Sequence, residues 1–361
     1  MGDSKKLFLL DAFALIYRGY YAFIKNPRIN SKGTDTSAIL GFMNSLLEII
    51  RTQNPDYLAV AFDKGGSITR SEMFTEYKSN RDKTPEPILI AIPYIKDILT
   101  AMKIPILEKE GYEADDVIGT LAKKAEKEGY QTFMVTPDKD FAQLVSENIF
   151  MYRPMFGGGY ETWGVEEVKE KFEIEHPDQV IDFLGMKGDA VDNIPGLPGV
   201  GDKTAKKFLA LYGSMEGLLA NTHELKGKMK EKVEANAELG LLSKKLARIL
   251  LDVPVDFNEK DFELNTPDIE KVKGLNKKTK WNHYSIGGLI RIKASDSKEM
   301  VNEILSNLDL IIVSDNGDTV TIEVPTYRVD VTREADVIEE VLRIYGFNNV
   351  PVPQKLNSSI S

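Results

Sequence analysis

Three short apolar runs, each ending in aspartate, constrain the fold of this chain more than any other feature. The runs are Lys6–Asp11, Asp56–Asp63 and Gln131–Asp140. Segments with helical periodicity separate them, at Ala12–Phe23, Ser37–Arg51, Pro87–Met102 and Val117–Glu128. Near-continuous apolar strands that alternate with helices indicate a parallel sheet covered on both faces. The sequence therefore predicts an α/β fold with a mostly parallel sheet flanked by helices.

Acidic side chains gather where these predicted strands end. Ligands of open parallel sheets bind at the carboxyl ends of the strands, and Asp11, Asp63, Asp138 and Asp140 all fall there. A single aspartate at a strand end is commonly a helix cap or a turn residue. Three strands with the same ending instead indicate a shared site.

A cluster of acids, Glu113-Ala114-Asp115-Asp116, opens the helical segment before the third run. Taken alone, these acids are explained by the helix dipole, because acidic side chains stabilise a helix N-terminus. Beside the strand-end aspartates, we expect them to face the same crevice, together with a further acidic pair in the loop around residue 190. These motifs contain nine carboxylates in all, namely Asp11, Asp63, Glu113, Asp115, Asp116, Asp138, Asp140, Asp189 and Asp192.

The chemistry of this acidic set points to divalent cations. Hard carboxylate oxygens suit Mg²⁺ or Mn²⁺. Two such ions can activate an attacking water and stabilise the leaving oxygen of a phosphodiester. We expect two or more ions. Without cations so many like charges would repel one another strongly, so the site should be loose or partly protonated when metal-free.

A turn rich in glycine and proline, Ile194–Val200, precedes a helix that starts near Lys203. Gly196 and Gly201 have the spacing of a nucleotide-binding phosphate loop, but Asp202 stands where that motif requires lysine, so an NTPase is rejected. A glycine-rich turn that opens a helix presents free backbone N–H groups to anions. A helix-hairpin-helix that holds a DNA backbone without reading bases fits better. Its predicted DNA contacts are Gly199, Gly201, Lys203 and Lys206.

The segment 67–84 is basic with interleaved aromatic residues, including Arg70, Tyr77, Lys78 and Arg81. Basic side chains follow a phosphate backbone and aromatic side chains stack on bases, so this pattern indicates single-strand binding. An ordinary solvated helix is the alternative.

Composition narrows the remaining classes of protein. The absence of cysteine excludes disulfides, thiolate catalysis and cysteine-bound zinc, and the three histidines are scattered. The net charge of −10 argues mildly against nucleic acid, but the nine predicted ligands account for almost all of it. Asp11 interrupts the N-terminal apolar run, so neither a signal peptide nor a membrane span is expected, and a cytoplasmic location without a membrane partner follows.

Residues 1 to about 275 resemble the N-terminal 5′-nuclease domain of bacterial DNA polymerase I, a relative of the flap endonucleases. Seven motifs carry the resemblance in order: Leu9-Leu10-Asp11, Ala61-Phe62-Asp63, Tyr77-Lys78 with Arg81, Gly111–Asp116, Thr136–Asp140, Gly188–Asn193 and Pro198–Ala205. The resemblance implies a PIN-like core and a 5′-3′ exonuclease or flap endonuclease that acts in DNA replication and repair. It also implies that the nine carboxylates hold the metals, usually Mg²⁺.

The same resemblance implies roles and partners. Lys78 and Arg81 would act on the scissile phosphate, within an arch over the single-stranded 5′ end, while Arg70 and Tyr77 would contact DNA. The expected substrates are 5′ flaps, nicks, single-stranded 5′ ends and RNA primers in duplex. A separate polymerase is a further candidate partner.

Residues from about 281 to 355 have a different pattern. A helical segment, Lys298–Leu308, precedes strand-like residues 311–313 and 319–324, joined by the hairpin signal Asp315-Asn316-Gly317-Asp318. Two motifs follow, Pro-x-Tyr-Arg-x-Asp at 325–330 and Asp-x-x-Glu-Glu-x-x-Arg-Ile-Tyr-Gly at 336–346. They resemble the B5 domain of the phenylalanyl-tRNA synthetase β chain. This resemblance implies a Mg²⁺ site and contacts with RNA or a synthetase α chain, whereas an acidic amphipathic helix is the alternative. The implied metal ligands are Asp330, Asp336, Glu339 and Glu340.

The expected organisation follows from these two resemblances. It comprises a metal-binding core at 1–175, a helix-hairpin-helix subdomain at 176–275, a junction at 276–280 and a small α+β domain at 281–361. The function that this organisation favours is metal-dependent 5′ nuclease activity. A synthetase β-chain fragment that binds RNA or subunits and an inactive DNA-structure-binding module are the alternatives.

Overall fold

The computed structural model describes most of the first 268 residues and selected parts of the remainder. The described residues are 5–30, 33–155, 157–268, 271, 289–293, 298–308, 310–315, 319–324, 331, 336–337 and 340–341. The chain divides into two compact units, one of residues 1–29 and 33–279, the other of residues 30–32 and 280–361.

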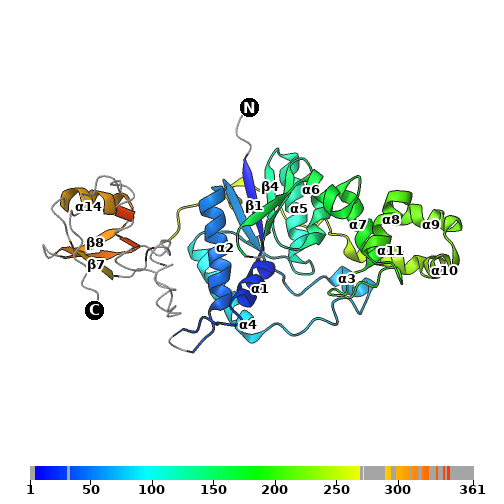
Figure 1. Ribbon diagram of the computed structural model, residues 1–361, viewed down its shortest axis with the longest axis horizontal. Helices are drawn as coiled ribbons and strands as arrows, with labels where there is room; N and C mark the ends of the chain where they lie inside the picture. Colours follow the sequence, from blue (N-terminus) through cyan, green and yellow to red (C-terminus); the bar gives the residue numbers. More distant parts are fainter. Residues whose placement is uncertain are drawn as a thin grey trace, which may run out of the picture. The chain divides into compact units, whose positions relative to one another are not determined.

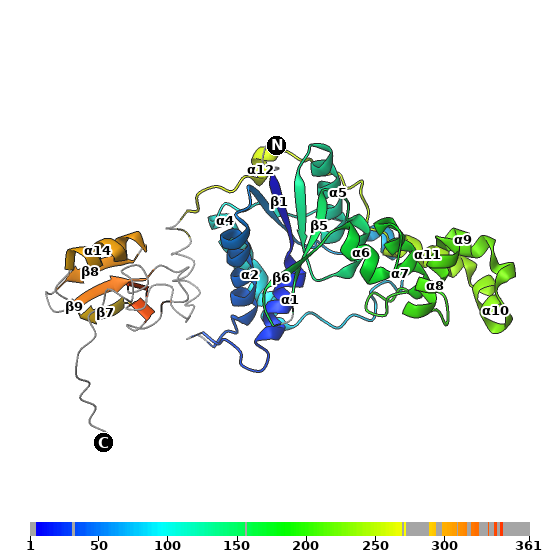
Figure 2. The same cartoon turned by 45° about the horizontal axis from the view of Figure 1, so that its top comes forward.

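A six-stranded sheet forms the centre of the first unit, with strand order β3-β2-β1-β4-β5-β6 (Figures 1 and 2). The pairs from β3 to β5 are parallel, and only β6 runs antiparallel to its neighbour. This confirms the predicted mostly parallel sheet. The strands are β1 (Lys6–Asp11), β2 (Tyr57–Ala61), β3 (Ile106–Leu107), β4 (Gln131–Val135), β5 (Ile149–Pro154) and β6 (Tyr160–Trp163).

Helices cover both faces of this sheet. Figures 1 and 2 show α1 (Ala12–Ala22), α2 (Ser37–Gln53) and α4 (Glu86–Ala101) on one side of β1, and α5 (Ala114–Lys127) on the other. Successive strand residues point to opposite faces, so a strand covered on both sides is apolar throughout. Leu7 to Leu10 of β1 are accordingly fully buried.

The two faces have separate packing. Leu7 and Leu9 share a core cluster with Ile118 and Leu121 of α5. Phe8 points the other way and stacks on Phe133 of β4, with 4.7 Å between ring centroids. Burial of this kind stabilises by about 25 cal/mol for each Å² of apolar surface, so the central strands anchor the edge that carries the aspartates.

A helical part of the first unit follows β6. Its helices are α6 (Val165–Phe172), α7 (Val180–Lys187), α8 (Asp202–Tyr212), α9 (Met215–Ala220), α10 (Gly227–Ala235) and α11 (Ala237–Ala247), with short turns η2 (Pro177–Gln179) and η3 (Thr222–Glu224). Helix α7 packs closely on α11 at Gly185, which has no Cβ. A Cβ there would lie only 2.7 Å from Lys244 Cα. The chain then returns past α5 to the short helix α12 (Glu259–Phe262) beside β2.

Two features of the first unit differ from the sequence expectation. The third apolar run is a strand only to Val135, and a 3₁₀ helix, η1 (Lys139–Leu144), follows it. Asp138 caps this 3₁₀ helix, because its side chain accepts a hydrogen bond from Asp140 N. The basic segment 67–84 is helical only in α3 (Ile68–Met73). Strands β3, β5 and β6 were not expected, since they are short or only partly buried.

The second unit contains a three-stranded antiparallel sheet in the order β7-β9-β8. Its described elements are β7 (Leu289–Lys293), α14 (Lys298–Asn307), β8 (Ile311–Asp315) and β9 (Thr319–Glu323). Strands β8 and β9 pair as the hairpin signal predicted. A small core includes Leu305, Leu310, Ile322 and Val324. In the described parts of both units, no helix is long and apolar enough to cross a membrane.

Candidate active site

The carboxyl ends of β1 and β2 and the N-terminus of α5 bring the first carboxylates together. Asp11, the last residue of β1, caps α1, since its Oδ1 accepts a 3.1 Å hydrogen bond from Ala14 N. Its Oδ2 accepts from Thr136 Oγ1, beyond β4, at 3.0 Å. Asp63 Oδ1 accepts a 2.7 Å bond from Ala114 N, the first residue of α5. These bonds connect the acidic strand ends to the helix that carries the acidic cluster.

Partial burial and like charges change the protonation of this edge. Removal from water, followed by the nearby charge of Asp63, raises the pKa of Asp11 to about 7. Burial likewise raises the pKa of Asp140 well above its ordinary range, and the charge of Asp138 adds to this effect. Asp140 Oδ1 is buried without a hydrogen-bond partner. An unpaired carboxylate oxygen beside other acids fits a bound cation.

Asp115 and Asp116 are neighbours with different surroundings. Asp115 is half-buried at the first turn of α5, whereas Asp116 is completely buried. Arg70 Nη1 and Nη2 donate to the two oxygens of Asp116 at 2.9 and 2.8 Å. Burial lowers the pKa of Arg70, but the charge of Asp115 and the bonds to Asp116 raise it above its ordinary value.

The structure corrects two predicted DNA contacts. Arg70 is 2% exposed, and all of its N–H groups lie against protein oxygens, so it has no donor for a phosphate. Tyr77 is 9% exposed, and its hydroxyl donates to Glu113 Oε2 at 3.1 Å, so its ring cannot stack on a base. The alternation of basic and aromatic residues predicted that both side chains are exposed. Local sequence alone does not show that they are buried.

Lys78 and Arg81 reach the acidic edge from the other direction. Lys78 Nζ donates to Glu113 Oε1 at 2.7 Å and lies 3.6 Å from Asp192 Oδ2. Arg81 pairs with Asp192. Lys78 has a left-handed backbone with φ +56°, and its N–H donates to Asp192 O at 2.9 Å. This contact holds the basic segment against the loop that carries the last acidic pair.

The carboxylates do not converge into one compact shell. No group of three or more His, Cys, Asp or Glu side chains in the described part of the chain lies close enough to hold a metal ion. Cationic side chains lie between the acids instead: Lys78 and Arg81 as above, and Lys139 with its Nζ 3.9 Å from Asp189 Oδ2. A divalent ion would therefore replace ammonium and guanidinium groups that already offset the negative charge of the carboxylates.

The predicted DNA hairpin lies at the start of α8. Gly199, with φ +87°, and Gly201, the N-cap of α8, are exposed, and so is Lys203. Lys206 is less available, because its Nζ donates to Glu173 Oε1 at 2.9 Å and to Lys171 O at 3.1 Å. A hydrogen bond from Lys187 lowers the pKa of Asp202, the residue that excluded an NTPase loop.

Family comparisons assign the chain. Residues 6–173 match the profile of the 5′-3′ exonuclease N-terminal resolvase-like domain, and residues 175–270 match the 5′-3′ exonuclease C-terminal SAM fold. A 5′-3′ exonuclease of Aquifex aeolicus is 39% identical over 269 residues, which are 74% of this chain and 90% of that protein. The chain belongs to the 5′-3′ exonuclease family. It is therefore a nuclease, as the sequence predicted.

Other matches set the limits of the likeness. DNA polymerase I of Bacillus caldotenax is 41% identical over 275 residues, 75% of this chain, but the chain spans only 31% of that polymerase. A zinc-bound T5 5′-exonuclease has a TM-score of 0.58 at 20% identity, covering 76% of this chain and 99% of its own. The catalytic core of Rad2 with DNA has a TM-score of 0.53 at 17% identity, covering 76% and 88%. These structures share the fold.

The C-terminal residues match another family. Residues 284–347 match the profile of the tRNA synthetase B5 domain, as the resemblance indicated. Asp336 and Glu340 lie in short helical stretches, and Glu340 is buried. The other two predicted tail ligands, Asp330 and Glu339, lie outside the described residues.

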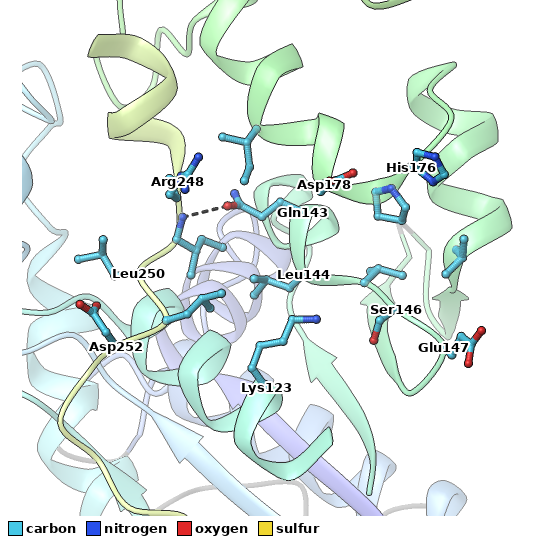
Figure 3. A pocket seen from close by; sticks show the side chains of 16 residues that line it. Lys123, Gln143, Leu144, Ser146, Glu147, His176, Asp178, Arg248, Leu250 and Asp252 are labelled. Carbon is cyan, nitrogen blue, oxygen red and sulfur yellow. Dashed lines mark hydrogen bonds between the residues drawn. The ribbon is translucent and has the colours of Figure 1, made fainter. Parts of the chain in front are cut away.

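A cavity of about 870 Å³, lined by Lys123 of α5 and by residues of η1, was not predicted (Figure 3). Residues 248–252 form one wall, facing Lys123 and His176. Gln143 bridges its lining, accepting from Ile249 N at 2.9 Å and donating to Ala247 O and Asp140 O. A buried glutamine in a short apolar turn gave no sequence signal of this role.

Proposed function

We propose that the chain is a metal-dependent 5′ nuclease that hydrolyses DNA at 5′ flaps, nicks and single-stranded 5′ ends, with RNA primers in duplex as further substrates. One observation carries the proposal: the ends of β1, β2 and β4 and the start of α5 place acids along one edge, where Asp140 Oδ1 has no partner. The family assignment supplies the reaction class, and proteins of the same fold, a T5 flap endonuclease with DNA and metal ions and the Rad2 catalytic core with a DNA substrate, support the ligands.

The acids on this edge would hold Mg²⁺ or Mn²⁺, two or more ions in all. When bound, such ions lower the pKa of a water and stabilise the charge of the leaving oxygen. The residues that would hold them are Asp11, Asp63, Glu113, Asp115, Asp138, Asp140, Asp189 and Asp192. Carboxylates alone provide the oxygen ligands that these cations prefer.

Lys78 and Arg81 would take the phosphate as their new partner. Both now lie against Glu113 and Asp192, and the carboxylates would release them on binding cations. Cations aimed at a phosphate stabilise the charge that develops during its displacement. The bound phosphate would thus replace an acid as their counter-charge.

The hairpin before α8 would hold the duplex backbone. Exposed Gly199, Gly201 and Lys203 place backbone N–H groups and one ammonium at a helix N-terminus, which favours phosphate. Contacts of this kind fix position without reading sequence, so a flap would be recognised by its shape.

The second unit would contribute a separate contact. Its match to the tRNA synthetase B5 domain supports binding to RNA or to a synthetase α chain, with a Mg²⁺ site as part of that proposal. The nuclease proposal does not depend on it.

Cleavage of a labelled 5′-flap DNA by the full chain tests the main proposal. We expect cutting near the flap junction with Mg²⁺, none with EDTA, and a loss in Asp138→Asn. Asp256→Asn is the matched control, since Asp256 is exposed and far along the chain from the acidic motifs. Flap binding without cleavage in Mg²⁺ and in Mn²⁺ would favour the inactive DNA-binding module instead.

A further inference from the structure

Asp116 has no oxygen lone pair left for a metal ion. Its Oδ1 accepts from Arg70 Nη2 at 2.8 Å and from Leu250 N at 2.8 Å. Its Oδ2 accepts from Arg70 Nη1 at 2.9 Å and from Glu113 N at 3.2 Å. A carboxylate offers about four acceptor sites, and here protein donors occupy a corresponding number. The residue is also completely buried.

Arg70 is saturated in the same way. Besides Asp116, its Nη1 donates to Glu113 Oε2 at 3.1 Å, and its Nη2 donates to Arg248 O at 2.8 Å. Its Nε donates to Leu246 O at 3.1 Å. A guanidinium carries about five N–H groups, and these contacts use all of them. The pair therefore connects α3, the start of α5 and the residues after α11.

Glu113 depends on this pair at two points. Asp116 accepts its backbone N–H, and Arg70 donates to its Oε2. Its other oxygen, Oε1, faces Lys78, which comes from the basic segment. The pair thus fixes both the backbone and the side chain of the acid that pairs with Lys78.

We propose that Arg70 and Asp116 are a positioning pair that holds Glu113 in place. Neither of the two residues binds a metal ion or DNA. This rests on the proposed nuclease function, and it removes Asp116 from the set of metal ligands that the resemblance implied. To bind a cation, Asp116 would have to release Arg70. A guanidinium left unpaired in the interior is strongly unfavourable.

Asp115 is the contrast within the same helical turn. It is half-buried, and its Oδ1 accepts only from the adjacent Asp116 N, at 2.7 Å. Asp115→Asn therefore tests a proposed ligand, and Asp116→Asn tests a proposed anchor, with the same chemical change at adjacent positions. A double variant, Arg70→Met with Asp116→Leu, replaces the buried ion pair with apolar side chains, which buried pairs often tolerate.

Bound Mn²⁺ per chain, counted by electron paramagnetic resonance, separates the two roles. We expect Asp115→Asn to bind fewer ions, and Asp116→Asn and the double variant to bind as many as the parent. On 5′-flap DNA, Asp116→Asn should lose about 10- to 100-fold in kcat with little change in KM, as partners of metal ligands do. The double variant lacks both contacts to Glu113, so its kcat should fall at least as far while its ion number stays that of the parent.

Loss of a bound ion in Asp116→Asn that the double variant does not restore would overturn the proposal. If Asp116→Asn fails to fold by circular dichroism, the double variant and Arg70→Lys carry the test. Arg70→Lys keeps the charge without the planar fork, so we expect lower kcat with unchanged ion number. If the parent chain binds Mn²⁺ but cuts no flap, the nuclease proposal is refuted instead. The ion counts are measured without cleavage, so the two failures can be told apart.

Discussion

Lys78 Nζ donates a 2.7 Å hydrogen bond to Glu113 Oε1, and this bond connects the basic segment 67–84 to the start of α5. The lysine reaches this position from a left-handed backbone. Its ammonium is the side chain best placed to exchange a carboxylate for a substrate phosphate.

Lys78→Met should therefore slow flap cleavage by about 10²- to 10³-fold in kcat, the effect of removing one donor to a developing charge. Single-turnover cleavage at saturating DNA measures this rate. Lys123→Met is the control, because Lys123 lies on the cavity side of α5. Unchanged cleavage in Lys78→Met would show that the lysine serves only as a counter-charge.

Divalent metal should stabilise the chain. Acids that repel one another in the free protein are relieved by a cation, and Mg²⁺ at 100 times its Kd would add about 2.7 kcal/mol to the free energy of unfolding. Thermal melts with EDTA and with increasing Mg²⁺ measure the shift. Asp140→Asn should reduce it, because this change removes the negative charge and one of the two oxygens of a carboxylate whose Oδ1 has no partner. An equal shift in that variant would argue against Asp140 as a ligand.

The loop that carries Asp189 and Asp192 should tolerate no side chain at Gly188. This glycine has φ +75°, and a Cβ there would lie 2.5 Å from Ile194 O. Gly213 has a similar φ of +73°, with a ψ of −30° against 176° at Gly188, and nothing lies within 4 Å of an added Cβ, so Gly213→Ala reports the cost of a positive φ without a clash, about 1–3 kcal/mol. Gly188→Ala should cost ~1–3 kcal/mol more through overpacking. Denaturant unfolding compares the two, and equal costs would contradict the tight packing.

Glu259 should make stability depend on acid pH. It accepts hydrogen bonds from Lys5 Nζ and Tyr57 Oη, which lower its pKa from 4.5 to about 2. Because the folded-state pKa lies below the unfolded value, the stabilisation is present above pH 4.5 and is lost as pH falls towards 2. The Tm of Glu259→Gln should thus approach the parent's only in that window. Glu263→Gln is an exposed control, and a pH-independent difference would reject the linkage.

Lys203 and Lys206 should differ as DNA contacts. Lys203 is exposed, whereas Lys206 already bonds to Glu173. Lys203→Ala should weaken binding equally for unrelated flap sequences and reduce the slope of log affinity against log salt by about 1. Lys206→Ala should have a smaller effect. A sequence-dependent loss in Lys203→Ala would mean that the hairpin reads bases.

The sequence by itself determined the architecture of the first unit. Apolar strands that end in aspartate and alternate with helices are local patterns, and they predicted the parallel sheet and the edge that carries Asp11, Asp63 and Asp138. The pattern did not predict β6, because this partly buried antiparallel edge strand lacks a continuous apolar run, nor β5, whose short apolar run ends without an aspartate.

Tertiary structure alone decided the roles of neighbours. Asp115 and Asp116 are identical and adjacent, yet only Asp116 turns into the interior towards Arg70, which lies 46 residues earlier in the chain. The same contact buries Arg70, which the basic segment 67–84 had predicted to be exposed. Charge and spacing identify which residues can bind a cation or a phosphate, but the packing of distant segments determines which of them have lone pairs and donors still available.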